Sequence, residues 1–207
     1  MTTSSENKKG SLVVFEGVDA SGKTTMSNML CGYLSRNNIQ SVYRKNSPKM
    51  PFDTTEKLFE GYLGYLECVC NSMPEIRSLL DTGVHVVHDR YTDSIDVFRD
   101  CVIRNVDRSI QEKCKREYEK LKKQVEIVRP DVGFYLFVEF EEARRRKGIK
   151  SNVDKIMFAN EETFYETSRM FEEIAKNNSG IIVDTTDKTI NEVFGIVQEK
   201  VRGELSV

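Results

Sequence analysis

Tryptophan is absent from this 207-residue sequence, and histidine and proline are rare, at two and four residues. Long apolar runs are also missing, since the longest covers only residues 132–138. A membrane-spanning helix needs about 20 such residues, so the sequence predicts no membrane contact. The 31 Lys and Arg residues nearly balance the 33 Asp and Glu residues. This lack of a basic excess argues against nucleic acid as a partner.

Cysteine is present, but not in the spacing of a disulfide framework or a zinc site. The five cysteines form an odd set, and no two are separated by two residues. This pattern favours reduced thiols in a reducing compartment. Residues 1–10 are polar and lack the apolar stretch of a signal peptide, so we expect a disordered tail and a cytoplasmic protein.

Short β-prone runs alternate with helical patterns along the rest of the chain. Branched and aromatic residues predict strands at 11–15, 41–44, 84–87, 132–138 and 181–183. Apolar residues at helical spacing predict helices at 24–36, 54–70, 74–81, 107–128, 141–147, 154–176 and 189–201. This alternation predicts an α/β fold, in which helices cover both faces of a parallel sheet of about five strands.

Two features of these predicted helices need interpretation. Pro74 fits the first turn of a separate helix, and Pro130 is expected to end the helix over 107–128. In that helix Lys and Arg are interleaved with Glu. A solvated helix face explains this mixture better than a nucleic-acid patch.

Ligands of parallel sheets bind beyond the carboxyl ends of the strands. One loop at such an end, residues 17–24, reads G-V-D-A-S-G-K-T and matches G-x-x-x-x-G-K-[ST] between a strand and a helix. Its glycines let backbone N–H groups surround phosphate oxygens. Lys23 can reach the outer phosphates, and the Thr24 hydroxyl can ligate Mg²⁺. The loop predicts nucleotide binding, while the absence of an N-K-x-D segment disfavours a GTPase.

A second polar segment follows the strand predicted at 84–87. Asp89 could act on Mg²⁺ or its water, and Arg90 could hold a phosphoryl group through two hydrogen bonds. A surface ion pair is the alternative for these two residues. We interpret His85 and His88, which lie in or beside the strand, as packing residues.

These motifs resemble those of the thymidylate kinase family of P-loop nucleoside-monophosphate kinases. Residues 15–25, F-E-G-V-D-A-S-G-K-T-T, are similar to the family's start, and Asp89-Arg90-Tyr91 followed by Ser94 is similar to its D-R-Y/H-x-x-S segment. Weaker matches follow in order at 129–138, 154–156, 164–166 and 182–185. The resemblance covers nearly the whole chain.

The resemblance implies a three-layer P-loop kinase fold in one domain, residues 11–207, with a small lid at about 144–154. It implies ATP-dependent phosphorylation of dTMP to dTDP with Mg²⁺, and a homodimer is compatible with it. The implied catalytic residues are Lys23, Asp89, Arg90, Arg144 and Arg146. The implied metal ligands are Thr24 and Asp89.

The resemblance also implies two nucleotide-binding sets. The expected ATP-binding residues are Gly17, Val18, Asp19, Ala20, Ser21, Gly22, Lys23, Thr24, Thr25, Asp184 and Thr185. The expected acceptor-binding residues are Asp19, Arg44, Lys49, Tyr65, Arg90, Ser94 and Phe98. For Tyr65, burial in the core is an equal alternative to stacking on the base. For the cationic run at 144–150, a solvated helix end is the alternative to a catalytic role.

The sequence departs from the family pattern where the base is read. The expected Arg on the helix of Tyr65 is missing, and residues 67–70 are Glu, Cys, Val and Cys. Ile95 stands where Asn or Gly often follows the motif serine. Two alternatives therefore stay open: a kinase for another nucleotide or a nucleoside, and a weakly active nucleotide-binding homologue.

Overall fold

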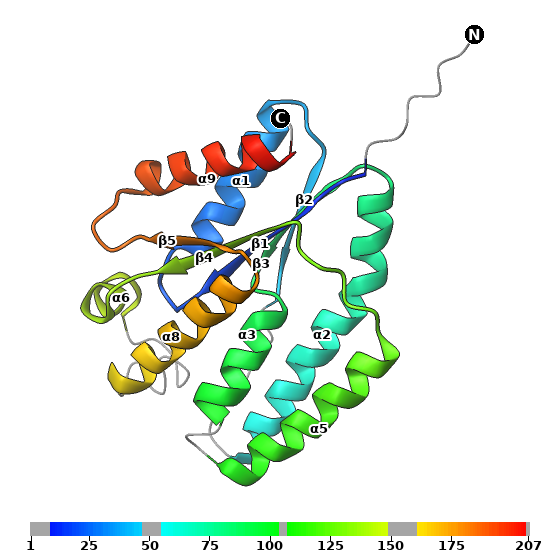
Figure 1. The fold of residues 1–207 in the computed structure, drawn as a ribbon, viewed down its shortest axis with the longest axis vertical. Helices are drawn as coiled ribbons and strands as arrows, with labels where there is room; N and C mark the ends of the chain where they lie inside the picture. Colours follow the sequence, from blue (N-terminus) through cyan, green and yellow to red (C-terminus); the bar gives the residue numbers. More distant parts are fainter. Residues whose placement is uncertain (1–8, 47–54, 104–106, 149–160, 206–207) are drawn as a thin grey trace.

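The computed structural model describes residues 9–46, 55–103, 107–148 and 161–205. Its centre is a sheet of five parallel strands in the order β2-β3-β1-β4-β5 (Figure 1). The strands are β1 (Leu12–Gly17), β2 (Ser41–Lys45), β3 (His85–Asp89), β4 (Val132–Phe137) and β5 (Ile181–Asp184). The predicted parallel sheet is confirmed, and the predicted strand ends are one or two residues off.

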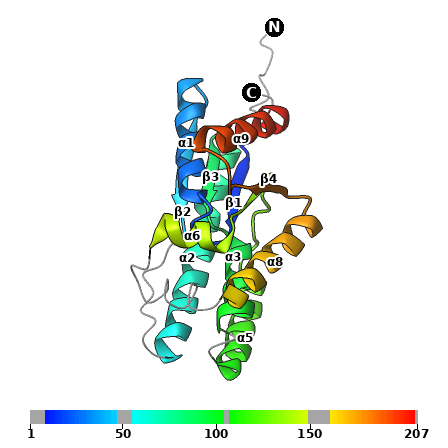
Figure 2. The same cartoon turned by 90° about the vertical axis from the view of Figure 1, so that its left-hand side faces the viewer.

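Helices cover both faces of this sheet (Figures 1 and 2). One face carries α1 (Lys23–Arg36) and α9 (Ile190–Leu205). The other face carries α2 (Thr55–Asp81), α3 (Thr92–Val97), α5 (Arg108–Gln124) and α8 (Glu161–Asn177). The short helix α6 (Phe140–Lys147) follows β4 beside α8. The predicted three-layer arrangement is therefore confirmed.

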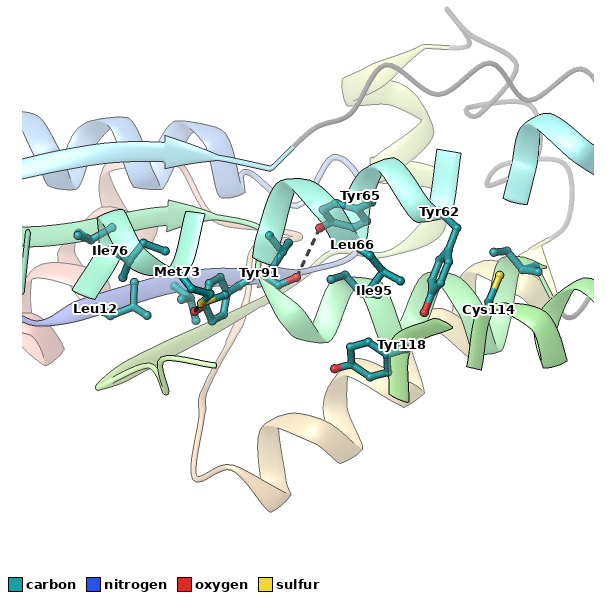
Figure 3. Packing of buried hydrophobic residues seen from close by; sticks show 14 of the residues in the cluster. Leu12, Tyr62, Tyr65, Leu66, Met73, Ile76, Tyr91, Ile95, Cys114 and Tyr118 are labelled. Carbon is teal, nitrogen blue, oxygen red and sulfur yellow. Dashed lines mark hydrogen bonds between the residues drawn. The ribbon is translucent and has the colours of Figure 1, made fainter. Parts of the chain in front are cut away.

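Alternation along the strands builds a separate apolar core on each face. Val13 and Phe15 of β1 face α1 and α9, whereas Leu12 and Val14 face α2. On that second face, Tyr65 and the residues around it pack between α2, α3 and α5 (Figure 3). With both faces buried, β1 is apolar along most of its length, as expected for the central strand of a parallel sheet.

Helix α2 corrects the prediction of two helices at 54–70 and 74–81. The structure has one continuous helix over Thr55–Asp81, with Pro74 inside it. A proline inside a helix costs about 3 kcal/mol. Here the apolar stripe continues past Pro74, since Met73, Ile76 and Leu80 join the same buried cluster as Leu66. Burial of this whole stripe offsets the missing hydrogen bond.

Two further predictions are wrong in the middle of the chain. Helix α5 ends at Gln124, not at Pro130, and Val125 is extended. The chain after α5 straightens to enter the sheet, where the Asp131 N–H donates to the Leu12 carbonyl oxygen at 2.9 Å. The sequence analysis also predicted no helix between β3 and α5, where α3 and the π-helix η1 (Phe98–Ile103) lie.

The helices predicted at 24–36, 141–147 and 189–201 agree with α1, α6 and α9 to within four residues. The helix predicted at 154–176 ends within one residue of α8, and its residues 154–160 lie outside the described residues. The apolar face predicted for α5 is buried through Ile110, Cys114 and Tyr118, and its basic residues are exposed. Most of the expected tail and lid, residues 1–8 and 149–154, lies outside the described residues. In the part of the chain that the structure describes, no helix could span a membrane.

Candidate active site

The P-loop joins β1 to α1 at the centre of the sheet. It turns through three residues with positive φ, which are Gly17 at 122°, Ala20 at 62° and Gly22 at 96°. At Gly17 a Cβ atom would lie 2.0 Å from the Leu136 carbonyl oxygen, so only glycine fits. The first N–H groups of α1 have no intrahelical partner and can bind an anion.

Lys23, the first residue of α1, folds its side chain back over this loop. Its Nζ donates to the Val18 carbonyl oxygen at 2.5 Å and lies 3.4 Å from the Ser21 hydroxyl. Burial, and then the positive charge of Arg90, lowers the pKa of the Lys23 ammonium to about 7. A phosphate chain bound in the loop would add negative charge beside Lys23 and favour its protonated form.

Asp89 ends β3 beside the P-loop and is 1% exposed. Its carboxylate accepts hydrogen bonds from the hydroxyls of Thr24 at 2.5 Å and Tyr43 at 3.2 Å, and pairs with Lys45 Nζ at 3.3 Å. Burial would raise the pKa of Asp89, but the Thr24 hydroxyl and the charge of Lys23 outweigh it and lower the pKa. Asp89 is therefore ionised next to a hydroxyl oxygen, a donor set suited to Mg²⁺.

Arg90 follows β3 in the left-handed conformation, with φ of 66°. Its guanidinium pairs with the Asp19 carboxylate and lies 3.3 Å from the Ser94 hydroxyl. Asp19 also pairs with Lys147 Nζ at 2.6 Å. Burial would raise the pKa of Asp19, but Arg90, Lys23 and Lys147 together hold it well below its usual range. A carboxylate of the P-loop thus lies between two cations.

Glu16 supports this arrangement from inside the sheet. It is fully buried, and its carboxylate accepts the N–H of Tyr91 at 2.7 Å, the N–H of Ser94 at 3.2 Å and the Ser94 hydroxyl. These groups start α3, so Glu16 caps that helix from β1. Burial, and then the charge of Asp93, raises the pKa of Glu16 to about 7.

The P-loop, Asp89 and Arg90 open onto one cavity of about 1010 Å³. Tyr65 of α2 and Phe98 of η1 line one end of it, on the β3 side of the P-loop, and residues 185–190 after β5 line the other end, on the opposite side in the strand order. Residues at the C-terminal end of α6 also line it. The cavity lies at the carboxyl edge of the sheet, where the sequence analysis expected function.

Most of the predicted site residues line this cavity. Every P-loop residue from 17 to 25 does so, together with Thr185, Asp89, Arg90, Tyr65, Ser94 and Phe98. Tyr65 is buried in the core, with 4% exposed, and it also lines the cavity, so burial and stacking on the base stay alternatives. Its hydroxyl lies 3.5 Å from the Tyr91 carbonyl oxygen (Figure 3). The roles of these residues stay predictions.

Three predicted residues are not among those that line the cavity. The guanidinium of Arg44 pairs with Glu75 on α2 instead. Arg144 pairs with Glu141 at 3.2 Å and lies over the Phe140 ring. Asp184 accepts hydrogen bonds from Thr186 in its own loop. Lys49 lies outside the described residues.

Arg146 lines the cavity and joins three elements around it. Its guanidinium pairs with Glu142 at 2.8 Å, lies 3.5 Å from the Ala20 carbonyl oxygen of the P-loop, and contacts the loop after β5. Its guanidinium donates to the carbonyl oxygens of Thr185 at 2.6 Å and Thr186 at 3.2 Å. These bonds hold Arg146 at the loop after β5. Its expected role at the transferred phosphoryl group stays a prediction.

The sequence analysis did not single out Glu16, Lys45 or Lys147, each of which contacts a predicted site residue. Lys45 could have been found from strand alternation, because it shares a face of β2 with Tyr43 and not with Arg44. Lys147 belongs to a cationic run in which the sequence does not distinguish one residue from the next. Nothing in the sequence indicates that Glu16 reaches across to α3.

Comparisons with known proteins agree with this geometry. The family model described as Thymidylate kinase matches residues 15–195. The chain belongs to the thymidylate kinase family. It is 30% identical to a thymidylate kinase of Plasmodium falciparum, over 94% of this chain and 91% of the relative. It is 28% identical to a probable thymidylate kinase of Methanococcus aeolicus, over 91% of this chain and 94% of the relative.

Solved structures of the family share the fold. The structure of thymidylate kinase from Candida albicans matches with a TM-score of 0.70 and 23% identity, over 94% of this chain and 92% of that one. A thymidylate kinase structure from Ehrlichia chaffeensis matches with a TM-score of 0.64 and 21% identity, over 94% and 99%. Family membership identifies a nucleoside-monophosphate kinase with ATP as co-substrate.

Proposed function

We propose that this chain transfers the γ-phosphoryl group of ATP to dTMP, giving ADP and dTDP. One observation carries the proposal: the P-loop and Arg90 open onto the same cavity, whose far end is walled by Tyr65 and Phe98. The P-loop can bind the phosphates of ATP, Arg90 can bind the phosphate of the acceptor, and the aromatic wall can contact the base of the acceptor.

The donor end of the cavity is suited to ATP. The N-terminus of α1 and Lys23 bind the phosphate chain. Residues 185–190 and Arg146, which borders them, line the cavity beside the P-loop and take the nucleoside part of ATP. Lys23, freed from the Val18 carbonyl oxygen, neutralises charge on the outer phosphates.

The residues at the P-loop fit Mg²⁺. The Thr24 hydroxyl and the Asp89 carboxylate are oxygen donors in direct contact, at 2.5 Å. Protein sites for Mg²⁺ with nucleotides use one or two such ligands together with phosphate oxygens. The ion, when bound, would neutralise charge that develops on the phosphates. Tyr43 and Lys45, which also contact Asp89, orient its carboxylate.

The acceptor end centres on Arg90. Its planar guanidinium can hold a phosphate through two hydrogen bonds. In the described structure that guanidinium pairs with Asp19, so the acceptor phosphate takes over part of this pairing when it binds. Asp19 then turns to the sugar hydroxyl. Tyr65 stacks on the base. The contact of its hydroxyl with the Tyr91 carbonyl oxygen fixes the position of the ring at the cavity.

The cations of α6 act at the transferred group. Phosphoryl transfer spreads charge over peripheral oxygens, where positive groups stabilise the transition state. Lys147, which pairs with Asp19, and Arg145 both line the cavity. We place one of them at the transferred phosphoryl group and assign residues 144–154 to a lid that excludes water.

A different acceptor is the second candidate, and the structure offers a specific reason for it. None of residues 67–70, where the family resemblance expects a base-reading Arg, lines the cavity. Val69 is buried in the core, and so is Ile95 on α3. The described residues therefore place no side chain that reads a pyrimidine at these positions, and a purine or another pyrimidine remains a competitor.

An acceptor panel tests the proposal. ADP release, coupled to a spectroscopic assay, is followed with dTMP, dUMP, dCMP, dGMP, UMP and thymidine. We expect the highest kcat/KM with dTMP and no activity of Lys23→Ala, which removes the phosphate-binding ammonium. A flat response to every acceptor would refute the kinase function, and preference for another acceptor would select the second candidate.

Arg90→Ala separates the two ends of the cavity. We expect kcat/KM for the acceptor to fall at least about 100-fold, because a charge-assisted pair with a phosphate is lost. ATP affinity, measured by calorimetry without acceptor, should stay within about twofold of wild type. Near-normal turnover would show that Arg90 does not hold the acceptor.

A further inference from the structure

Arg90 has a backbone conformation that non-glycine residues rarely adopt. Its φ of 66° lies in the left-handed region, where the Cβ atom crowds the following carbonyl oxygen. Such conformations persist only where the surrounding structure holds them, and they are frequent at functional sites. Glycine would relieve this crowding but would remove the guanidinium, so the turn needs support from its neighbours.

His88 provides support from one side. It is fully buried on β3, and its Nδ1 lies 2.9 Å from the carbonyl oxygen of Arg90. A carbonyl oxygen only accepts hydrogen bonds, so Nδ1 carries the proton and donates it. The imidazole ring is itself held by Tyr91, with 5.2 Å between the ring centroids. The packing role expected for His88 is therefore incomplete, because the ring also grips the backbone of the turn.

Strand β1 provides support from the other side. The Arg90 N–H donates to the Phe15 carbonyl oxygen at 3.0 Å. The next N–H, that of Tyr91, donates to the Glu16 carboxylate at 2.7 Å. With the His88 bond, the backbone groups on both sides of the Arg90 Cα atom are bound to buried partners. The same carboxylate also fixes Ser94, whose hydroxyl lies 3.3 Å from the guanidinium.

We propose that His88 and Glu16 are positioning residues that lock the left-handed turn at Arg90 and so aim its guanidinium into the cavity. Neither needs to touch a substrate. This inference rests on the proposed function in one respect, namely that Arg90 binds the phosphate of the acceptor. Without the His88 bond, φ of Arg90 relaxes to negative values and the guanidinium leaves Asp19 and Ser94. Acceptor binding weakens, whereas the P-loop, which lies outside this turn, keeps its affinity for ATP.

Substitutions of His88 test the proposal. His88→Leu fills the same space but donates no hydrogen bond, and we expect the KM for dTMP to rise about three- to tenfold. The KM for ATP should change less than about twofold. His88→Asn should restore most of the dTMP affinity, because its Nδ2 lies at the same distance from the backbone as Nδ1 of histidine. A role in packing alone would not give this split or this rescue.

His85 offers a matched control. It lies on the same strand, and its Nδ1 also bonds to backbone, as it accepts the Ser11 N–H at 3.1 Å. It does not line the cavity. His85→Leu should leave both KM values within about twofold of wild type. If His88→Leu does not fold, His88→Gln carries the same test, because its amide lies one carbon further out and cannot replace Nδ1.

Crystal structures of wild type and His88→Leu, both without nucleotide, give a readout that needs no substrate. We expect φ of Arg90 to be positive in wild type and to leave the left-handed region in the variant. A variant that keeps a positive φ and an unchanged KM for dTMP would overturn the proposal. If wild type phosphorylates no acceptor, the proposed function fails, and φ of Arg90 alone decides the positioning role.

Discussion

Asp19 is a carboxylate of the P-loop that lies between two cations of the cavity. It pairs with Arg90, which we propose binds the acceptor phosphate, and with Lys147, one of the two cations proposed for the transferred phosphoryl group. We expect Asp19→Asn to destabilise the nucleotide-free protein by about 1–3 kcal/mol, because two partly buried cations lose their partner. Inorganic phosphate should replace the lost anion.

Thermal unfolding in a phosphate titration measures this effect. The melting temperature of Asp19→Asn should rise more steeply with phosphate than that of wild type. Chloride at equal ionic strength serves as the control for screening. If the melting temperatures of the two proteins rise equally with phosphate concentration, Asp19 does not occupy the position of a substrate phosphate.

Glu16 predicts a pH dependence of stability. Its pKa rises from 4.5 to about 7 on folding, so between these values the folded state binds more protons than the unfolded state. The stability from Glu16 is therefore complete below pH 4.5 and is lost as pH rises through 7. Chemical denaturation of wild type and Glu16→Gln at several pH values measures this pH dependence of the free energy of unfolding. From pH 5 to 8 wild type should lose about 2–3 kcal/mol more than the variant.

Among single residues, the sequence predicted the site residues that belong to short motifs. Lys23, Thr24, Asp89 and Arg90 all lie within short motifs at strand ends, and all line the cavity. Glu16 acts across the sheet on α3, at a separation of 75 residues from Tyr91. No local pattern encodes such a contact, because it depends on the register between β1 and β3.

At the scale of elements, helix α2 shows a local signal that tertiary burial overrides. Pro74 predicts a break, yet the stripe of apolar residues on either side of it packs on the same core. We expect Pro74→Ala to raise the free energy of unfolding by about 1–2 kcal/mol, because residue 74 regains a backbone donor. Part of this gain is offset by the greater freedom of the unfolded chain.

Urea denaturation of Pro74→Ala, with kcat measured in parallel, tests this expectation. The activity should stay close to that of wild type, since Pro74 does not line the cavity. A drop in stability would show instead that the helix needs Pro74 itself in order to pack against β3 and α5. Ser72→Ala, two residues before Pro74 and outside the buried cluster, serves as the control.

Helix α3 shows the opposite case, an element without a sufficient local signal. It has six residues, and its N-terminus is capped by Glu16 instead of by its own N-cap side chain. Short helices depend on tertiary contacts for their stability. The sequence therefore predicted the motif that begins this segment but not the helix that carries Ser94 into the cavity.

At the scale of the whole molecule, the order of the strands explains why distant motifs meet. β1 is paired with β3 on one side and β4 on the other, so the P-loop and Arg90 leave neighbouring strands at the same edge. Alternation of strands and helices predicted this edge, because parallel strands place all their carboxyl ends together. The sequence did not show which residues of α6 line the cavity, because that helix carries several adjacent cations.

The continuity of the cavity leads to a prediction about the molecule as a unit. If donor and acceptor occupy its two ends, one compound that joins adenosine and thymidine through five phosphates should fill both. It should raise the melting temperature more than ATP and dTMP together at equal concentrations, because a single molecule loses its translational freedom once. Lys23→Ala and Arg90→Ala should each remove much of this increase, as each variant loses the anchor at one end. An increase that is sensitive to Lys23→Ala but not to Arg90→Ala would place the thymidine half elsewhere and separate the acceptor site from the guanidinium.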